Sequence, residues 1–295
     1  MNKRKGIILA GGKGSRLYPL TTAVSKQLLP IYDKPMIFYP ISTLMSIGIR
    51  DILIITTPQD REPFQKLLGD GDKWGVNFEF EEQNSPDGIV QAFIIGRNFI
   101  KDSQPVLILG DNLFHGSSLS KTFAEASKIN KGATVFAYPV KDPERYGVLT
   151  FNKEGFVLDI EEKPNNPKTN YAITGIYFYD ETVIEKSLKV KQSNRGEYEI
   201  TDLNKMYLQE KSLRVEIMGR GTAWLDTGNH DSLHEASGYI KTLENRQGLK
   251  VGCPEEVAWR NSWISDNQLE KIAKDLSKSG YGDYLLNLIK KNGSI

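Results

Sequence analysis

The chain has 295 residues, of which 38 are Lys or Arg and 37 are Asp or Glu, so its formal net charge is +1. This balance excludes a protein that binds polyanions through bulk charge, and nucleic-acid binding would need a local basic patch. Hydrophobic residues make up 39% and charged residues 25%, values typical of globular proteins rather than disordered ones. At about 150 residues per domain the length predicts about two domains, although α/β folds often run to about 250 residues as one.

Cysteine and apolar content indicate the compartment. Cys253 is the single cysteine, which excludes an intrachain disulfide framework and a multi-cysteine metal site. No apolar run approaches the roughly 18 residues of a membrane span. The first residues resemble a signal peptide briefly, but the apolar stretch is too short and Lys13 and Arg16 follow almost at once. We therefore expect a soluble cytoplasmic protein with no membrane or nucleic-acid partner.

Short β-branched runs alternate with helical patterns over the first half of the chain. Buried or extended strands are predicted over residues 6–10, 51–56, 76–81, 106–109 and 134–138. Helices are predicted around 37–45, where Pro40 marks a candidate start, and over 61–68 and 119–129; one helical face is shared by Ile89, Ala92, Phe93 and Ile100. Apolar strands interleaved with amphipathic helices predict a mostly parallel sheet covered by helices on both faces.

The pattern changes after about residue 139. Closely spaced strands at 146–151, 156–161 and 172–179 predict an antiparallel excursion from the main sheet. A helix over 200–210, a strand over 213–218, a helix over 231–246 and an amphipathic helical tail from residue 250 follow. Two apolar helix faces in the tail are formed by Leu269, Ile272, Ala273 and Leu276, and by Tyr281, Tyr284, Leu285 and Leu288. Two short amphipathic helices cannot make a core of their own, so each face must dock on another surface.

A glycine-rich loop follows the first predicted strand, with the sequence Leu9-Ala10-Gly11-Gly12-Lys13-Gly14-Ser15-Arg16-Leu17. Its glycines free backbone N–H groups to approach an anion, and Lys13 and Arg16 add charge of the right sign. The spacing fits neither G-x-x-x-x-G-K-[ST] nor the dinucleotide loop, whose third glycine is replaced by Leu17. The loop is therefore a phosphate loop of another type, or an ordinary turn.

A second segment makes the interpretation of the glycine loop more specific. Ten residues beyond Arg16 stands Lys26-Gln27-Leu28-Leu29-Pro30, and the composite resembles the sugar-1-phosphate nucleotidylyltransferase family. Further segments agree over essentially the whole chain: Gln83 with Ser85-Pro86-Asp87-Gly88, Leu109-Gly110-Asp111-Asn112, Glu144-Arg145-Tyr146-Gly147-Val148, Glu161-Glu162-Lys163-Pro164, Gly175-Ile176-Tyr177, Arg195-Gly196-Glu197-Tyr198-Glu199-Ile200-Thr201-Asp202 and Trp224-Leu225-Asp226-Thr227-Gly228. The resemblance is closest to the thymidylyltransferase branch, from which the chain departs at Asn229, where Thr is expected.

The resemblance implies an α/β fold with a Rossmann-like, mostly parallel mixed sheet flanked by helices, an antiparallel excursion on the sugar side and a helical C-terminal tail. It divides the chain into a catalytic domain, 1–248, and a tail, 249–295, with a regulatory or interface role. Within the catalytic domain it implies a nucleotide-binding part over about 1–138 and a sugar-binding part over about 139–230.

The implied reaction joins dTTP and α-D-glucose 1-phosphate into dTDP-glucose and pyrophosphate, the first step of dTDP-rhamnose or deoxysugar synthesis. Thymine and uracil differ by one methyl group, worth only about 1 kcal/mol in a pocket, so UTP or another hexose 1-phosphate stays open. A non-catalytic regulator that binds nucleotide-sugars is the alternative from another class of protein.

This reaction brings two anions together and so needs cations and a metal ion. Asp111 follows a buried strand and should lie at the carboxyl edge of the sheet, where the glycine loop also emerges. Asp226 follows another short apolar segment. Two carboxylates from distant segments suit Mg²⁺, which takes few protein ligands when phosphates fill its other positions. The alternative is that Asp111 caps the next helix and Asp226 a turn.

Four basic residues are expected at the phosphates. Arg16 and Lys26 would bracket the triphosphate, with Arg16 on the leaving pyrophosphate and Lys26 on the transferring phosphoryl group. Lys163 would hold the sugar phosphate with help from Arg195. Any single one could instead be a solvated surface charge. The residues assigned to catalysis are Arg16, Lys26, Lys163, Asp111 and Asp226.

The remaining assignments separate a nucleotide side from a sugar side. Gln83 can donate to and accept from a pyrimidine edge, Gly88 lets the base come close, and Gln27 assists at the ribose or base. The resemblance adds nucleotide contacts from Leu9, Gly11, Gly12, Gly14, Ser15 and Arg16. On the sugar side it implies Asn112, Tyr146, Gly147, Glu162, Lys163, Ile173, Tyr177 and Arg195, with Glu162 accepting from sugar hydroxyls. Trp224 either packs on the sugar or belongs to the core.

The resemblance also suggests a homotetramer with a second, regulatory site near subunit contacts. Its ligand would be dTDP-rhamnose, acting as a feedback inhibitor. The residues carried over are Arg220, Val251, Cys253, Glu256 and Arg260, with Arg220 for the diphosphate and short side chains leaving room for the ligand. The simpler expectation for the tail helices is that they dock on the body of their own subunit.

Overall fold

The computed structural model describes residues 4–292. Four parallel strands form the centre of its sheet: β1 (Arg4–Ala10), β4 (Asp51–Thr56), β5 (Asn77–Glu82) and β6 (Gln104–Leu109). Strand β1 pairs with β4 on one side and β6 on the other, so that Gly6 lies opposite both Ile52 and Val106. The carboxyl ends of β1 and β6 are therefore neighbours, which brings the glycine loop beside the segment that follows β6.

The antiparallel strands extend the same sheet rather than forming a separate one. They are β8 (Ala133–Pro139), β9 (Gly147–Phe151), β10 (Val157–Glu162) and β11 (Tyr171–Tyr179), joined by β12 (Leu213–Ile217). Strand β11 runs antiparallel to β6, β8 and β9, while β12 runs parallel to β8. The nine-stranded order is β10-β9-β11-β6-β1-β4-β5, with β8 and β12 branching from β11.

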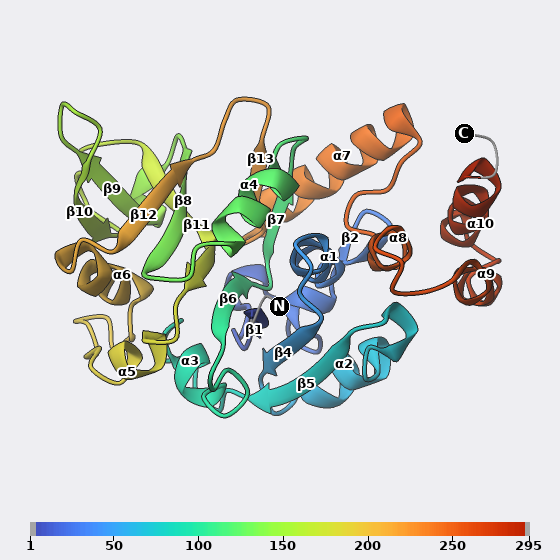
Figure 1. The fold of residues 1–295 in the computed structure, drawn as a ribbon, viewed down its shortest axis with the longest axis horizontal. Helices are drawn as coiled ribbons and strands as arrows, with labels where there is room; N and C mark the ends of the chain where they lie inside the picture. The colour runs from blue at the N-terminus through green and yellow to red at the C-terminus, as the bar shows by residue number, and fades with distance from the viewer. Residues whose placement is uncertain (1–3, 293–295) are drawn as a thin grey trace.

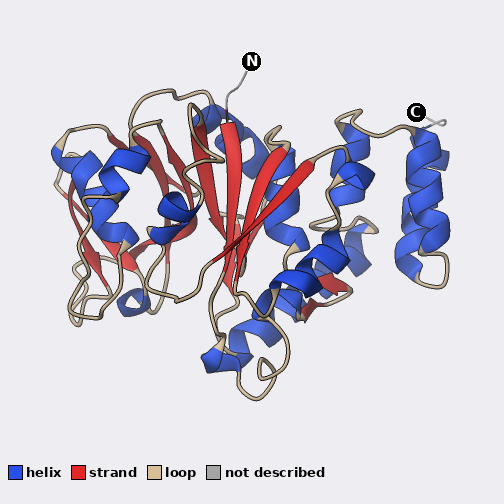
Figure 2. Cartoon of the chain, turned by 90° about the horizontal axis from the view of Figure 1, so that it is seen from below, coloured by secondary structure: helices blue, strands red, loops and turns tan. Residues whose placement is uncertain are grey.

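Helices cover both faces of the sheet, as the burial of consecutive residues such as Ile7 and Ile8 in β1 requires (Figure 2). Ile8 packs on the face with α1 (Phe38–Ser46), α2 (Arg61–Leu68), α4 (Leu119–Ser127) and α8 (Pro254–Arg260). Ile7 packs on the opposite face, which is covered by α3 (Gln91–Ile95), α5 (Val183–Ser187) and α6 (Ile200–Gln209). This architecture confirms the predicted α/β fold and all of the strands predicted in the first half of the chain.

Two predicted helices differ from the observed helices at their ends. The helical face predicted from Ile89 to Ile100 is wrong in extent, because α3 stops at Ile95 and Gly96 leads the chain into turns. Ile100 is nevertheless buried, so the apolar spacing reflected burial rather than one continuous helix. Pro40 does not start α1 but lies in its first turn, where the missing N–H has no intrahelical partner to lose.

Two pairings of short strands have no counterpart in the sequence prediction. Strand β7 (Asn112–His115) pairs antiparallel with β13 (Ala223–Asp226), and β2 (Pro30–Ile31) pairs with β3 (Lys34–Pro35). Helix α7 (His230–Gln247) follows β13. The side chain of Asn229 caps it by accepting from the Ser232 N–H at 2.9 Å, so the residue that departs from the family pattern is an effective N-cap.

The C-terminal tail docks on its own subunit. Helices α9 (Asp266–Asp275) and α10 (Gly280–Asn292) pack together at the end of the molecule opposite β9 and β10 (Figure 1). Leu269, Ala273, Leu285 and Leu288 are buried in the core that also contains α1 and α8. The described part of the chain has no helix that is both long and apolar enough to cross a bilayer.

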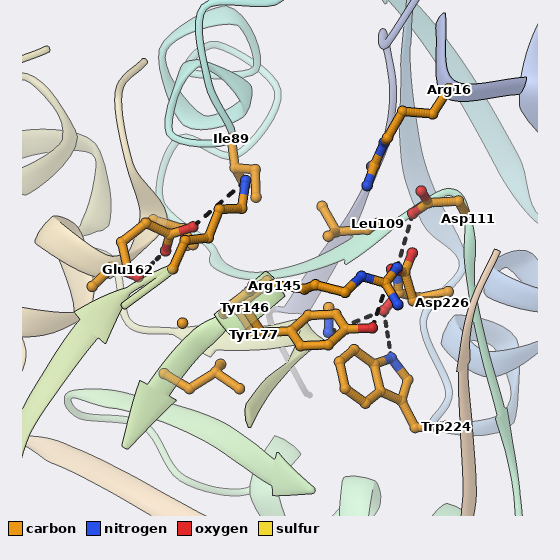
Figure 3. A pocket seen from close by; sticks show the side chains of 17 residues that line it. Arg16, Ile89, Leu109, Asp111, Arg145, Tyr146, Glu162, Tyr177, Trp224 and Asp226 are labelled. Carbon is orange, nitrogen blue, oxygen red and sulfur yellow. Dashed lines mark hydrogen bonds and ion pairs between the residues drawn. The ribbon is translucent and has the colours of Figure 1, made fainter. Parts of the chain in front are cut away.

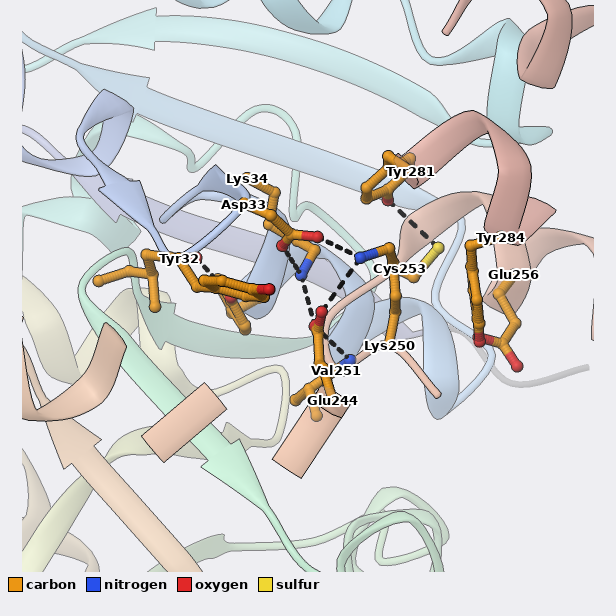
Figure 4. A network of polar contacts seen from close by, with 12 residues as sticks. Tyr32, Asp33, Lys34, Glu244, Lys250, Val251, Cys253, Glu256, Tyr281 and Tyr284 are labelled. Atoms are coloured by element: carbon orange, nitrogen blue, oxygen red, sulfur yellow. Dashed lines mark hydrogen bonds and ion pairs between the residues drawn. The ribbon is translucent and has the colours of Figure 1, made fainter. Parts of the chain in front are cut away.

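A buried ionic network ties the start of the tail to the β2–β3 turn (Figure 4). Lys34 Nζ lies 2.8 Å from Glu244 Oε1 and 2.5 Å from Asp33 Oδ1. Lys250 pairs with the same Asp33 and lies 3.1 Å from Glu244 Oε2, while the Val251 N–H donates to Glu244 at 3.0 Å. The tail is therefore fastened to a turn that begins only a few residues after Lys26.

Candidate active site

A cavity of about 190 Å³ opens where the carboxyl end of β6 meets the antiparallel strands (Figure 3). The structure brings ten of the predicted site residues to its wall: Arg16, Asp111, Asn112, Tyr146, Gly147, Glu162, Lys163, Ile173, Tyr177 and Asp226. The wall also includes residues that the sequence did not assign, among them Arg145, Gly175 and Thr201. Because these residues come from segments more than one hundred positions apart, the cavity is a product of the sheet topology.

Asp111 and Asp226 meet through the β7–β13 pairing, which places Asp226 opposite Asn112. The Thr227 N–H and hydroxyl both donate to the Asp111 carbonyl, at 3.2 and 2.8 Å. Asp111 is followed directly by a strand, and α4 begins only at Leu119, so the alternative in which Asp111 caps the next helix is excluded.

Each of the two carboxylates is paired with a cation of the protein. Lys26 binds Asp111, and Arg145 Nη2 lies 3.3 Å from Asp226 Oδ2, to which the Tyr146 hydroxyl also donates at 3.4 Å. Burial raises the pKa of Asp226, and the neighbouring charge of Asp111 raises it further. Burial also acts to raise the pKa of Asp111, but the charge and hydrogen bond of Lys26 outweigh it and hold that pKa below its ordinary value.

Asn112 organises the floor of the cavity. Its Oδ1 accepts from the Trp224 indole N–H at 2.6 Å and from the Gly175 N–H at 3.1 Å, and its Nδ2 donates to Asp111 at 2.9 Å. A Cβ at position 175 would lie 2.4 Å from that Oδ1, so glycine is required there. Trp224 is buried in the core and also lines the cavity, so its place in the core is confirmed, while packing on the sugar stays a prediction.

Glu162 faces the cavity from the end of β10. Its Oε2 accepts from the Thr201 hydroxyl, while Oε1 lies 4.0 Å from Lys163 Nζ and 3.7 Å from Arg195 Nη1. Arg195 is held by Glu197 at 3.0 Å and by Glu199 at 3.1 Å, and it does not line the cavity. The sugar side thus combines a carboxylate acceptor with Lys163 in its wall and with Arg195, which other carboxylates hold just outside the wall.

Apart from Arg16, the residues expected on the nucleotide side do not line the cavity. The amide of Gln83 donates to Gln91 at 2.6 Å and to the Gly88 carbonyl at 3.3 Å. A Cβ on Gly11 would lie 2.3 Å from Gln83 Oε1, and one on Gly88, whose φ is 122°, would lie 2.4 Å from the Tyr198 carbonyl. The glycine loop therefore packs against Gln83 only because it lacks a side chain.

The remaining residues expected to contact the nucleotide lie in the glycine-rich loop or near it in the sequence. Leu9 is the penultimate residue of β1, and the segment after it contains the exposed Gly12 and Ser15 and the half-buried Gly14, whose φ is 63°. Gln27 is buried and its Oε1 accepts from the Ser25 hydroxyl at 2.9 Å. Sequence reasoning missed Gln91, which orients Gln83, and no sequence signal pointed to it.

The residues expected at a regulatory site lie near a second cavity of about 300 Å³ between α1, β7 and the start of the tail. Val251 and Glu256 line it, and Arg260 pairs with Glu256 at 2.7 Å. Arg220 is exposed and outside its wall. Cys253 is buried in the core, where its sulfur accepts from the Tyr281 hydroxyl at 3.2 Å and burial raises the pKa of the thiol.

Two oxygen donors from Asp111 and Asp226 could hold a hard divalent cation together with substrate oxygens. Within residues 4–292 no group of three or more His, Cys, Asp or Glu side chains is arranged to hold a metal by itself. The donor chemistry and the mutual repulsion of the two carboxylates fit a cation that is shared with phosphates.

Comparison with known proteins agrees with this geometry. A family model described as nucleotidyl transferase matches residues 5–242. Proteins named glucose-1-phosphate thymidylyltransferase are 56% identical in Neisseria meningitidis, over 97% of this chain and all of that protein, and 57% identical in Xanthomonas campestris, over 99% of each. The Mycobacterium tuberculosis protein of that name is 56% identical over 98% of this chain and all of its own.

Solved structures show the same fold. A Bacillus anthracis protein assigned as a glucose-1-phosphate thymidylyltransferase and solved with sucrose is 41% identical, with a TM-score of 0.75 over 80% of this chain and 94% of that one. A UDP-glucose pyrophosphorylase complexed with UDP-glucose is 23% identical, with a TM-score of 0.72 over 82% of this chain and all of that one, a likeness of fold alone. The chain therefore belongs to the nucleotidyl transferase family, among relatives that are named glucose-1-phosphate thymidylyltransferase.

Proposed function

We propose that this protein transfers the thymidylyl group of dTTP to α-D-glucose 1-phosphate, giving dTDP-glucose and pyrophosphate. The observation that carries the proposal is the meeting of Asp111 and Asp226 between the glycine loop and the wall that holds Glu162 and Lys163. This arrangement suits a reaction in which two phosphate groups must be brought together. Relatives that are named glucose-1-phosphate thymidylyltransferase, 54–57% identical over nearly the whole chain, support the choice of substrates.

In this mechanism an oxygen of the sugar phosphate attacks the α-phosphorus of dTTP directly and in line, and pyrophosphate leaves. Lys163, with Arg195 behind it, holds the sugar phosphate, and Glu162 accepts hydrogen bonds from sugar hydroxyls. Arg16 stabilises the charge that develops on pyrophosphate, while Lys26 serves the transferring phosphoryl group. The acceleration comes from positioning and charge neutralisation, without a covalent enzyme intermediate.

Asp111 and Asp226 are the residues that would hold Mg²⁺. The ion would supply positive charge at the reacting phosphates. Two facts about the chain support this assignment: the donors are oxygens only, and Asp111 raises the pKa of Asp226, a repulsion that a shared cation removes.

Base recognition is assigned to Gln83 and Gly88, with Gln27 near the ribose or base. The bond from Gln83 to Gln91 fixes the amide and leaves its oxygen toward the glycine loop. Thymine and uracil differ by one methyl group, worth only about 1 kcal/mol in a pocket, so UTP remains the competing nucleotide.

We also propose that the protein is a cytoplasmic homotetramer at the first step of dTDP-rhamnose synthesis, inhibited by dTDP-rhamnose at the second cavity. Val251, Glu256 and Arg260 lie at that cavity or contact its wall, which supports a ligand there. Arg220 would reach the diphosphate from the neighbouring loop. Cys253 would act from beneath the site, since it is buried.

The test measures turnover in the presence of Mg²⁺ as the release of pyrophosphate. It compares dTTP with UTP, each with glucose 1-phosphate and with several other hexose 1-phosphates. We expect the fastest turnover with dTTP and glucose 1-phosphate, and loss of turnover in Asp226→Asn. Faster turnover with UTP or another sugar phosphate would move the assignment to that substrate. Binding of nucleotide-sugar without any turnover would favour the regulator instead.

A further inference from the structure

Arg145 has a place in the cavity that the proposed mechanism does not use. It ends a short 3₁₀ turn, Pro143–Arg145, and its guanidinium lies over the Tyr146 ring, 5.2 Å from the ring centre (Figure 3). One nitrogen, Nη1, is held by Asp142 at 2.6 Å, outside the reaction site. The other, Nη2, reaches Asp226 at 3.3 Å. The side chain is 31% exposed, so it has room to move.

The contact with Asp226 occupies one of the two carboxylate oxygens that a shared cation could use. Arg145 touches Oδ2 of Asp226, the same atom that accepts from Tyr146, and Lys26 holds Oδ2 of Asp111. The two carboxylates are thus neutralised by two protein cations when no other cation is present. A divalent cation that binds both carboxylates competes with Arg145 for the negative charge of Asp226, whichever of its two oxygens the cation takes.

The two contacts of Arg145 differ in a way that favours exchange. The short bond to Asp142 is an anchor, and the longer contact to Asp226 is the one that can be given up without freeing the side chain. Once released, the guanidinium would face a cavity that also receives Lys163 and Arg16. A planar guanidinium suits the oxygens of a phosphate group, which it can bind through two parallel N–H bonds.

We propose that Arg145 is exchanged between Asp226 and the phosphate of the sugar phosphate. It neutralises Asp226 while the cavity is empty, and when a divalent cation takes that carboxylate, it turns about its Asp142 contact and binds the phosphate. The sugar phosphate is the partner because Arg145 shares its chain segment with Tyr146 and Gly147, which line the sugar side. This inference rests on the proposed function, which supplies both the cation and the sugar phosphate.

The exchange makes the two binding events favour each other. A cation that frees Arg145 improves phosphate binding, and by linkage the phosphate must improve cation binding by the same factor. Couplings between sites typically lie between about 5-fold and 150-fold. We expect about 10-fold here, and we expect the coupling to depend on the Arg145 side chain.

The experiment titrates the whole protein with Mn²⁺ and follows the free ion by electron paramagnetic resonance. Glucose 1-phosphate is present or absent, and no nucleotide is added, so no turnover occurs. In the unmodified protein we expect glucose 1-phosphate to tighten Mn²⁺ binding about 10-fold and glucose to leave it unchanged. In Arg145→Gln we expect tighter Mn²⁺ binding without ligand, weaker binding of glucose 1-phosphate and a coupling close to 1. Arg145→Lys should keep part of the coupling.

The matched control is Arg61→Gln, because Arg61 pairs with Glu82 on the surface and does not line the cavity. It should titrate like the unmodified protein, and thermal melts establish that each variant is folded. Equal or weaker Mn²⁺ binding in Arg145→Gln, with the coupling intact, would overturn the exchange. If the unmodified protein turns over dTTP and glucose 1-phosphate while the titrations fail, only the exchange is wrong. If turnover fails, the proposed function is wrong, and tighter Mn²⁺ binding in Arg145→Gln would still show that Arg145 competes with the cation for Asp226.

Discussion

Glu244 gives the sharpest test of the network that fastens the tail to the β2–β3 turn. Its carboxylate faces Lys34, whose side chain is only 1% exposed, and it also contacts Lys250 and the Val251 N–H. The substitution Glu244→Gln keeps the shape and an acceptor for Val251 but removes the charge. Hydrogen bonds to charged groups contribute about 1.5–3 kcal/mol each.

The loss should be smaller than the sum of two such bonds, because Asp33 continues to pair with both lysines. We therefore expect Glu244→Gln to lower the free energy of unfolding by about 2–4 kcal/mol, which overlaps the roughly 3–5 kcal/mol for breaking a buried pair. For a chain of this size about 2 °C per kcal/mol applies, so Tm should fall by roughly 4–8 °C.

The assay is urea unfolding followed by tryptophan fluorescence, with all variants at one protein concentration because assembly alters apparent stability. Glu270→Gln is the control, since its partner Lys274 is exposed and the pair should contribute little. Adding Lys34→Met to Glu244→Gln should recover part of the loss, because it removes a buried ammonium that has lost one of its two carboxylate partners. A Glu244→Gln midpoint equal to that of the control, or a double variant whose loss is the sum of the two single losses, would refute the reasoning.

The remaining predictions concern turnover and inhibition. Asp111→Asn and Asp226→Asn should each lower kcat at least about 100-fold with non-additive losses, because they serve one ion; a double loss equal to the product of the singles argues against sharing. Arg16→Ala should lower kcat more than it raises the KM for dTTP, and a change in KM alone would make its role simple binding. Gln83→Ala should weaken dTTP and UTP by similar factors, whereas an effect on dTTP alone would mean that it senses the methyl group. Arg220→Ala should relieve inhibition by dTDP-rhamnose while uninhibited kcat stays within a few-fold; inhibition that survives and is competitive with dTTP removes the second site.

Much of the fold follows from local pattern. The alternation of Ile7 and Ile8 between two cores, and the apolar runs of β4 and β6, reflect strands buried on both faces, a property that is written in consecutive residues. The position of Asp111 after such a strand predicts that it lies at the carboxyl edge of the sheet, beside the glycine loop, and the pairing of β1 with β6 confirms this.

The pairing of short strands from distant segments could not be predicted from this local pattern. Strands β7 and β13 have four residues each, too few for a periodic signal, and each is defined by its partner rather than by its own sequence. Their pairing nevertheless decides the site, because it carries Asp226 to Asp111 and Trp224 to Asn112.

The sequence by itself determined which residue types are present and the edge of the sheet at which the glycine loop and Asp111 emerge. Only the tertiary structure decided how the charges are shared: Lys26 with Asp111, Arg145 with Asp226, and Lys34 with Glu244. The reason is physical. Spacing along a chain reports which side of a strand or helix is buried, whereas an ion pair depends on distances of a few ångströms between segments that are set by packing.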